Sequence, residues 1–250
     1  MRTDSLSLKN RIRQKLDTTL EVPNDVLQEI FKTFTVLDEN DQIQPLNFNI
    51  SIPHANALYR TILKNKPRVV LEVGMAYGIS SLVIGTALNN ITPKGRFISI
   101  DPFQSEHYHN IGMHNLQRGN LSGNHQLIEQ VDYLALPKLI EEGLEIDLAY
   151  IDGYHTFDYT LLDFFYIDRM LKVGGIVGFN DCALPAVKRV IGYVRTHRKY
   201  QKIDVGLRPN FMSSNLFSML RQILTLSSKS DRYFQKREDW EPEWNYYRRF

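Results

Sequence analysis

The chain has 250 residues, 43% of them hydrophobic and 23% charged, with a formal net charge of +2. This is the composition of a globular chain long enough for one substantial core, and the small net charge argues against nucleic acid or a membrane surface as partner. The single cysteine, Cys182, excludes an internal disulfide and indicates a reducing compartment, so we expect a cytoplasmic protein.

Residues 1–45 predict a helical extension made of two amphipathic helices. In the first, apolar residues recur at every fourth position, at Leu8, Ile12, Leu16 and Leu20. The second begins near Pro23 and has apolar residues at three- and four-residue spacing. The polar, charged start lacks a signal-peptide pattern, and no apolar run approaches membrane-spanning length. The two apolar stripes leave open whether these helices cover the core of the same chain or join a homo-oligomer.

The stretch VVLEVGMAYGISS at residues 69–81 predicts a strand, a glycine loop and a helix. Residues 69–73 form an apolar, β-branched run, as in a strand buried on both faces. Glu72 is expected at the exposed end of this strand, because burying an unpaired carboxylate is costly. Gly74 and Gly78 bracket a turn, and helical spacing begins after Ser80. In open α/β sheets, cofactors bind in the crevice at this end of the strands.

The glycine spacing separates the candidate cofactors. A dinucleotide fingerprint needs glycines where Ala76 and Ile79 stand, and a phosphate loop needs a lysine after Gly78. An NAD-dependent oxidoreductase is therefore disfavoured. The remaining pattern, E-x-G-x-x-x-G, resembles the first motif of class I S-adenosylmethionine (SAM) methyltransferases, and most closely the small-molecule O-methyltransferases related to catechol and caffeoyl-CoA O-methyltransferases. The alternative is a structural glycine turn, as in any α/β protein.

The resemblance implies SAM as the cofactor. Its carboxylate would meet amide N–H groups at the loop and the helix start, and Glu72 would hold its ammonium directly or through water. The expected contacts in this stretch are Glu72, Gly74, Met75, Ala76, Tyr77, Gly78, Ser80 and Ser81. In the resembled enzymes a helix placed like the one predicted at 53–64 borders the cofactor, so residues 52–55 are expected near SAM. We interpret His54 as a surface or capping histidine.

The next strand, RFISI at 96–100, ends in Asp101, whose two oxygens suit the vicinal hydroxyls of a ribose. Its distance from the glycine loop, about 25 residues, is close to the usual spacing for this role, although Asp before Pro also forms turns. Pro102 and Phe103 follow, and Phe103 is expected to cover the adenine. Four histidines nearby match no metal-ligand spacing, so we expect solvated or capping roles for His107, His109, His114 and His125.

The rest of the chain continues the alternation of strands and helices. Strands are predicted at 125–130, 176–181, 202–207 and 232–238, and one more within 146–155, where the apolar run ends at Asp152. Helices are predicted at 133–142, 157–171 and 184–200, with a Lys-Val-Gly-Gly turn at 172–175. The expected fold is α/β: a Rossmann-like, seven-stranded, mostly parallel sheet with an antiparallel seventh strand, plus the N-terminal helical extension. Residues 46–250 would form the SAM-dependent methyltransferase domain. Its insertion at 208–230 would act as a lid or interface, and the aromatic tail would pack on the sheet edge or on a neighbouring molecule.

A second resemblance lies in the run from IDGYH (151–155) to FNDC (179–182). It is similar to SAM methyltransferases with an IDG-x-H signature, which include sugar O-methyltransferases of macrolide antibiotics. Oxygen atoms of Asp152, Asn180 and Asp181 are then expected to converge as a Mg²⁺ site. In the macrolide enzymes the residue matching Asn180 is acidic, and Cys182 stands where catechol O-methyltransferase has Asn. Capping of strand-to-helix loops is the alternative role.

His155 matches the histidine that acts as general base in the macrolide enzymes, and Asp152 is its expected catalytic partner. Tyr154, Phe157 and Tyr159 would line a wall for the acceptor. The predicted reaction is methyl transfer from SAM to a hydroxyl oxygen of a small molecule, a sugar or natural-product intermediate. Two alternatives stay open: a metal-independent methyltransferase acting on another acceptor, and a catalytically inactive SAM-binding module.

Overall fold

The computed structural model describes residues 19–47, 49–207 and 231–250. Most of the predicted first helix, whose apolar stripe runs from Leu8 to Leu20, and the insertion at 208–230 therefore lie outside the described residues; Leu20 itself is described and is not helical.

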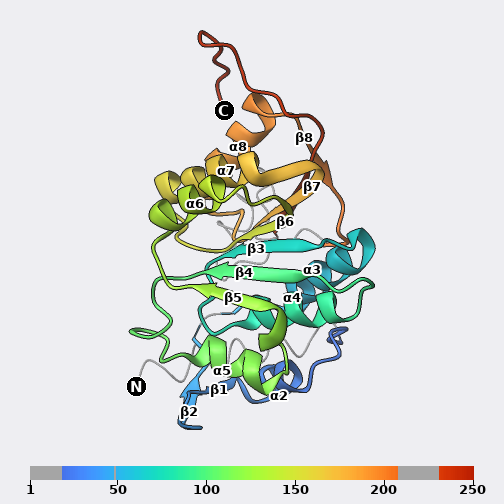
Figure 1. Cartoon of the computed structure of the whole chain (residues 1–250), viewed down its shortest axis with the longest axis vertical. Helices are drawn as coiled ribbons and strands as arrows, with labels where there is room; N and C mark the ends of the chain where they lie inside the picture. Colours follow the sequence, from blue (N-terminus) through green and yellow to red (C-terminus); the bar gives the residue numbers. More distant parts are fainter. Residues whose placement is uncertain (1–18, 48, 208–230) are drawn as a thin grey trace, which may run out of the picture.

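A seven-stranded sheet forms the centre of the molecule, in the order β5-β4-β3-β6-β7-β9-β8 (Figure 1). The strands are β3 (Val69–Val73), β4 (Arg96–Ile100), β5 (His125–Ile128), β6 (Ile146–Ile151), β7 (Leu171–Phe179), β8 (Tyr200–Ile203) and β9 (Arg232–Lys236). Neighbouring strands are parallel except for β9, which runs antiparallel to β7 and β8. This order confirms the predicted Rossmann-like sheet with an antiparallel seventh strand.

Helices cover both faces of the sheet and enclose two hydrophobic cores. One core lies under α2 (Asp25–Thr33), α3 (Ile52–Asn65), α4 (Ile79–Asn89) and α5 (Ile111–Arg118). The other lies under α6 (Asp132–Glu141), α7 (Phe157–Met170) and α8 (Pro185–His197), which are grouped together beside β6 and β7 in Figure 1. Because side chains alternate along a strand, Val70 of β3 joins the first core while Leu71 and Val73 join the second.

The N-terminal region contains the predicted second helix and an unexpected hairpin. Helix α2 is capped by Asn24, whose side-chain oxygen accepts a hydrogen bond from the N–H of Leu27. Strands β1 (Thr35–Leu37) and β2 (Ile43–Pro45) then form a two-stranded antiparallel sheet. Since α2 packs into the same core as α3 and α4, the helix serves as core cover, and the predicted domain boundary at residue 45 stays a prediction.

Strand β7 differs from the predicted turn and strand. It begins at Leu171, directly after α7, and includes the Lys-Val-Gly-Gly stretch that was expected to lie outside it. Leu171 pairs with Ile146, whereas the next pair joins Ile176 to Leu148, so the residues between form an irregularity in the strand. Gly174 has a φ of 89°, a left-handed conformation that suits glycine. Strand β8 also begins two residues earlier than predicted and ends at Ile203.

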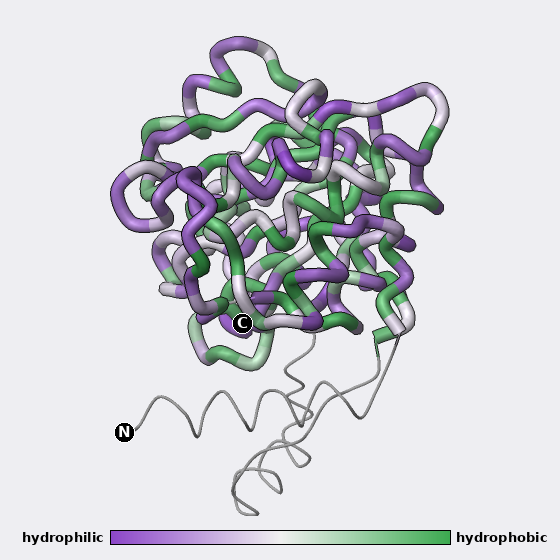
Figure 2. The backbone as a smooth tube through the Cα atoms, turned by 90° about the horizontal axis from the view of Figure 1, so that it is seen from below, coloured by the Kyte–Doolittle hydropathy of each residue, from purple (hydrophilic) through white to green (hydrophobic). Residues whose placement is uncertain are grey.

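The C-terminal segment packs on α8. The rings of His197, Tyr193 and Phe250 pack against one another, and the His197 centroid is 4.8 Å from that of Tyr193 and 5.2 Å from that of Phe250. The hydroxyl of Tyr246 donates to the carbonyl of Thr196. In Figure 2 the protruding loops are largely hydrophilic while hydrophobic stretches run through the interior. Among the helices of the described residues, none combines the length and apolar character that crossing a membrane requires.

Candidate functional site

The glycine loop after β3 is held between β6 and α5. Gly74 has a φ of 87° and Gly78 a φ of 76°. A Cβ on Gly74 would lie 2.3 Å from the carbonyl oxygen of Asp152, and one on Gly78 would lie 2.9 Å from the Cα of Gly112 in α5. Both the conformation and the space therefore require glycine. The predicted loop brings its backbone against the end of β6, where the predicted catalytic residues begin.

Asp101, at the end of β4, braces this loop. Its Oδ2 accepts hydrogen bonds from the N–H groups of Met75 (2.9 Å) and Ala76 (2.7 Å). Its Oδ1 accepts from the N–H of Phe103 at 2.8 Å. Since a carboxylate oxygen can accept two hydrogen bonds, Oδ1 has capacity for one more donor. The residue predicted to bind a ribose is thus also the residue that positions the loop.

Glu72 contradicts the expectation of an exposed carboxylate. Its side chain is 0% exposed, and its Oε2 accepts hydrogen bonds from the hydroxyls of Ser81 (2.5 Å) and Ser99 (2.6 Å). The prediction was wrong because two hydroxyls from separate elements, α4 and β4, replace water at this oxygen. Oε1 accepts no hydrogen bond from the described residues. Burial raises the pKa of Glu72. Ser81 faces Glu72, so its hydroxyl is already engaged in the interior.

His155 lies between two carboxylates at the ends of β6 and β7. Its Nε2 is 3.7 Å from Oδ1 of Asp152 and 3.8 Å from Oδ2 of Asp181. Burial lowers the pKa of His155, and the negative charge of Asp181 partly opposes this. The pKa of Asp152 is raised well above its usual value, by burial and by repulsion from Asp231 and Asp181. The geometry combines a neutral imidazole with carboxylates able to stabilise its protonated form.

A buried carboxylate next to this group was missed by the sequence interpretation. Asp231, the residue before β9, has a fully buried side chain that accepts hydrogen bonds from the hydroxyl of Tyr150 (2.7 Å) and from Nδ2 of Asn180 (3.2 Å). Its Oδ1 is 3.6 Å from Nδ1 of His54. Burial raises the pKa of Asp231 to about 6. The only sequence signal was an acidic residue directly before the antiparallel strand.

His54 therefore differs from its interpretation as a surface or capping residue. It lies in the first turn of α3, its side chain is only 18% exposed, and it faces Asp231. The two histidines of this edge, His54 and His155, each face buried or half-buried carboxylates.

The predicted metal ligands fit Mg²⁺ in donor chemistry and charge. Asp152 and Asp181 supply carboxylate oxygens whose mutual repulsion a cation would relieve. Asn180 directs its Nδ2 to Tyr150 and Asp231, which leaves Oδ1 as the amide atom suited to a cation. In the part of the chain that the structure describes, no group of three or more His, Cys, Asp or Glu side chains has the geometry of a metal site.

Aromatic side chains border the site. Tyr154 and Phe157, on either side of His155 in the sequence, are exposed. The ring of Tyr154 lies 5.3 Å from that of Tyr159 and 6.3 Å from that of Phe103. Because Phe103 and Pro102 directly follow Asp101, this aromatic surface extends from the predicted ribose contact to the predicted base.

Comparisons with known proteins bear on the domain and the fold. Residues 71–182 match a family model described as a methyltransferase domain. A sequence search among curated proteins finds no match. The cofactor-bound structure of Rv0187 from MTB is 15% identical, with a TM-score of 0.67 over 91% of this chain and 97% of that one.

Two O-methyltransferases are also similar in structure. One is TomG from Streptomyces achromogenes, which is involved in tomaymycin synthesis and was solved with SAM. It is 14% identical, with a TM-score of 0.62, over 95% of this chain and 100% of TomG. The other, from Bacillus cereus, was solved with SAH, the demethylated product of SAM. It is 13% identical, with a TM-score of 0.60, over 79% and 89% of the two chains. At these identities the likeness shows the fold.

Proposed function

We propose that this chain, whose residues 71–182 match a methyltransferase-domain model, transfers the methyl group of SAM to a hydroxyl oxygen of a small molecule. The observation that carries the proposal is the position of His155 between Asp152 and Asp181, at the sheet edge where the glycine loop also ends. A cofactor crevice and a neutral base at one sheet edge are what methyl transfer to a hydroxyl requires.

SAM would bind along the glycine loop. The amide N–H groups at the start of α4 suit its carboxylate, and Oε1 of Glu72, which has no partner among the described residues, suits its ammonium. Oδ1 of Asp101 can accept a ribose hydroxyl in addition to the N–H of Phe103.

The chemical step would be an in-line displacement at the methyl carbon. The bond between sulfur and the methyl group breaks as the new bond to the acceptor oxygen forms, so the sulfonium becomes a neutral thioether. The hydroxyl proton passes to Nε2 of His155, and the carboxylates of Asp152 and Asp181 stabilise the resulting imidazolium. The protein contributes alignment of the donor and the acceptor and a place for the proton.

If Mg²⁺ assists, Asp152, Asp181 and Oδ1 of Asn180 would hold it. When bound, the ion lowers the proton affinity of the acceptor hydroxyl. We expect chelator to abolish turnover and added Mg²⁺ to restore it, with SAM affinity much less affected. Asp181→Asn should behave as the chelated enzyme does. Full turnover in excess chelator would exclude a required metal and leave His155 as an unassisted base.

The acceptor would be a hydroxyl compound with a flat or apolar surface. The aromatic side chains of Phe103, Tyr154 and Tyr159 provide the matching wall. A sugar or natural-product intermediate fits this description, and the structurally similar TomG is involved in tomaymycin synthesis.

Calorimetry with SAM and SAH tests the cofactor assignment. We expect Kd values in the low-micromolar range or below, thermal stabilisation on binding, and no measurable binding of NAD, which serves as the control. Release of SAH with a panel of phenols, sugars and polyketides then tests turnover. Binding of SAM without turnover on any acceptor would favour the inactive SAM-binding module, and absence of SAM binding would overturn the proposal. A homo-oligomer stays a prediction, to be checked by sedimentation.

A further inference from the structure

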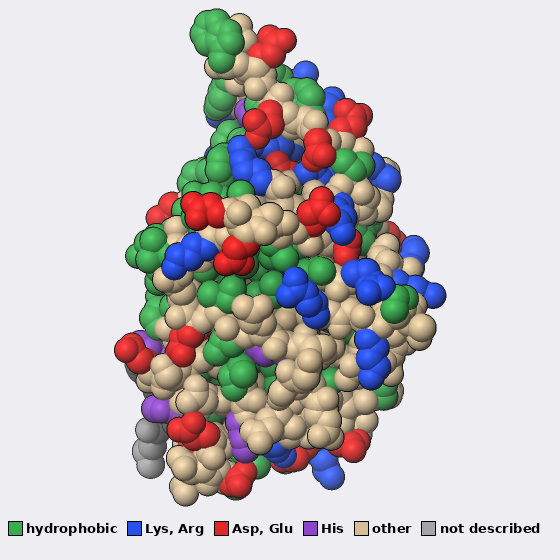
Figure 3. All heavy atoms as spheres, viewed as in Figure 1, with side chains coloured by type: hydrophobic (Ala, Val, Ile, Leu, Met, Phe, Trp, Pro, Cys, Tyr) green, Lys and Arg blue, Asp and Glu red, His purple; other side chains and the backbone are tan. Residues whose placement is uncertain are grey.

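A basic hollow lies at the amino ends of the parallel strands, whereas the glycine loop lies at their carboxyl ends. The hollow is formed by the end of α8, the start of β8 and the segment after β9, and its volume is about 480 Å³. Its lining contains five cationic side chains and one acidic one: Arg195, Arg198, Lys199, Arg237, Arg248 and Glu238. In Figure 3 Lys and Arg side chains are visible in the upper part of the molecule, around the C-terminal segment. Because the amino ends of the parallel strands lie here, the hollow is separate from the methyl-transfer site.

Most of this positive charge is not neutralised by the protein. Arg198 is paired with Asp168 and lies 4.0 Å from Glu241. Among the described residues, none of the other four cations forms an ion pair with a carboxylate. The whole chain has a net charge of only +2, so this excess is local. Like charges around one hollow repel each other, and a bound anion would relieve that repulsion.

Aromatic rings hold two of these cations in place. Nζ of Lys199 lies 5.2 Å from the ring centroid of Trp240, and the guanidinium carbon of Arg248 lies 5.7 Å from that of Tyr246. The two rings pack edge to face with centroids 5.4 Å apart. Cation–π contacts restrict side chains that would otherwise be mobile, so less conformational entropy is lost when an anion binds.

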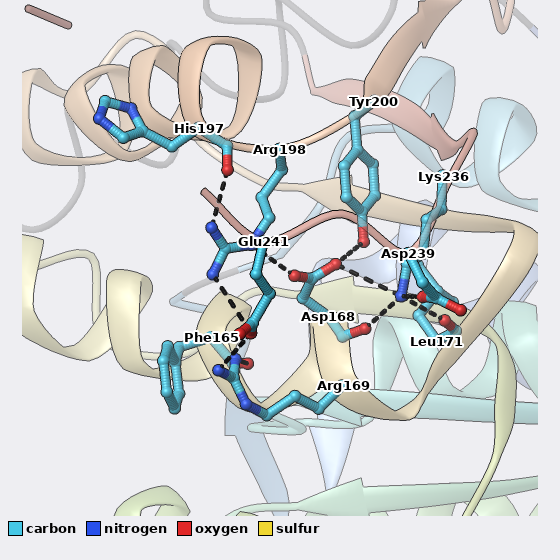
Figure 4. A network of polar contacts seen from close by, with 10 residues as sticks. All are labelled: Phe165, Asp168, Arg169, Leu171, His197, Arg198, Tyr200, Lys236, Asp239 and Glu241. Atoms are coloured by element: carbon cyan, nitrogen blue, oxygen red, sulfur yellow. Dashed lines mark hydrogen bonds and ion pairs between the residues drawn. The ribbon is translucent and has the colours of Figure 1, made fainter. Parts of the chain in front are cut away.

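Arg198 forms a rigid part of the lining. It is 7% exposed, its Nε donates to Oδ2 of Asp168 at 2.7 Å, and its Nη1 donates to the carbonyl of His197 at 2.7 Å (Figure 4). Because this guanidinium is buried and donates two hydrogen bonds, it keeps a fixed position in the lining. Asp168 balances the charge of Arg198, so Arg198 fixes the shape of the lining. The excess positive charge comes from the four cations without carboxylate partners in the described part of the chain.

We propose that this hollow binds a small molecule bearing two or three linked phosphate groups. Several separated cations exceed what one phosphate can contact, and Arg side chains match phosphate oxygens with paired donors. The volume lies within the range of small-molecule sites, roughly 300–1,000 Å³. A nucleic acid would need a longer basic track, which the small net charge of the chain does not favour.

Tryptophan fluorescence provides a direct test, because the chain has only two tryptophans, Trp240 and Trp244. Trp244 is 97% exposed, so Trp244→Phe leaves Trp240, in the hollow, as the single reporter. Inorganic triphosphate added at low salt should give a saturable change in fluorescence with a micromolar Kd that weakens as salt increases. The double variant Arg195→Gln, Arg248→Gln should bind at least tenfold more weakly.

Three comparisons make this test decisive. Lys188→Gln, an exposed change on α8 outside the hollow, should bind triphosphate like the parent, and melting curves confirm that each variant is folded. Equal binding by the double variant and this control would overturn the proposal. So would orthophosphate binding as tightly as triphosphate, which would indicate an adventitious ion only, or a single-stranded oligonucleotide binding more tightly than triphosphate. No SAM is present, so failure here is independent of the proposed methyl transfer.

Discussion

Two polar clusters, one at the amino ends and one at the carboxyl ends of the parallel strands, differ in how their charges are balanced. At the amino edge, Asp168 faces two buried cations, Arg198 at 2.7 Å and Lys236 at 3.6 Å, and accepts a hydrogen bond from the hydroxyl of Tyr200 (Figure 4). At the carboxyl edge, Asp152, Asp181 and Asp231 gather around two histidines. No Lys or Arg of the described residues forms an ion pair with these three carboxylates.

The difference separates a structural cluster from the one proposed to carry the function. Buried charges that are paired and hydrogen-bonded on all sides hold elements together, and here they join α7, β8 and β9. Burial, together with repulsion from neighbouring carboxylates, raises the pKa values of Asp152 and Asp231. Such an arrangement costs stability and is typical of sites that bind a cation or move a proton. Substitutions in the two clusters should therefore affect different measurements.

The largest expected effect is on turnover, in His155→Ala. If Nε2 accepts the hydroxyl proton, the change should lower kcat by about 10²–10⁴-fold without a matching loss of SAM affinity. The matched control is His114→Ala, because His114 also lies near a carboxylate, 3.2 Å from Asp41, but on α5 and not beside Asp152 or Asp181. An effect of tenfold or less in His155→Ala, at saturating SAM and acceptor, would count against His155 as the base.

The next effect is on stability, in Asp168→Ala. Removing the shared anion leaves the buried Arg198 without its carboxylate partner at 2.7 Å and leaves Lys236 with Asp239 alone, which should lower the free energy of unfolding by about 3–5 kcal/mol. Denaturant titration measures this, and the Kd for SAM of the folded variant should be unchanged. The control is Glu145→Ala, an exposed partner of Lys172, for which the loss should stay below about 1 kcal/mol. A large change in the SAM affinity of Asp168→Ala would contradict a purely structural role for the Asp168 cluster.

A third prediction concerns the cofactor, in Asp101→Ala. The change removes the acceptor for the N–H groups of Met75 and Ala76 as well as the proposed ribose contact. SAM binding should weaken by about 1.5–3 kcal/mol, as is typical of hydrogen bonds to charged groups. Calorimetry with Asp101→Asn shows whether the charge or the hydrogen bonds matter more. Wild-type affinity in Asp101→Ala would exclude this strand end from the cofactor site.

Local patterns in the sequence predicted most of the fold. The strand at 96–100 matches β4 residue for residue, and the apolar run before Asp152 matches β6. The fold prediction succeeded because strands buried on both faces consist of short, continuous apolar runs between turn signals. The stretch at 172–175 was misread because its glycines predict a turn equally well whether the chain leaves the strand or forms an irregularity within it.

Contacts between residues that are far apart in the chain could not be predicted from the sequence. The carboxylate of Glu72 is buried because Ser99 reaches it from another strand, which no local pattern reveals. Asp231 and its partner Tyr150 are 81 residues apart, and Lys236 bonds to the backbone of Asp168, 68 residues away. Such pairs depend on the strand order, so they follow only after the topology is known. The roles of His155 and the predicted SAM contacts stay predictions.

The smallest expected effect is the pH dependence of stability due to His125. This residue lies on β5, next to Ser99, whose hydroxyl donates a hydrogen bond to Glu72. Its Nε2 lies 3.0 Å from Oγ of Ser99, and burial lowers its pKa from 6.5 to about 4. A lowered folded-state pKa gives stability that is present above pH 6.5 and is lost as the pH falls towards about 4. The loss should amount to about 1–2 kcal/mol, because the ring is only partly enclosed.

His125→Gln should remove this component, so the difference between wild-type and variant unfolding free energies should shrink steadily between pH 6.5 and 4. The difference is the informative quantity, since buried acids such as Asp163, whose pKa is raised well above its usual value, contribute the opposite slope to both proteins. His109→Gln, at an exposed position, is the control and should leave the pH profile parallel to that of the wild type. A His125→Gln profile equally parallel to the wild type would mean that this imidazole can be protonated in the folded state as readily as in the unfolded chain. The interior around Ser99 and Glu72 would then be open to water from the side of β5.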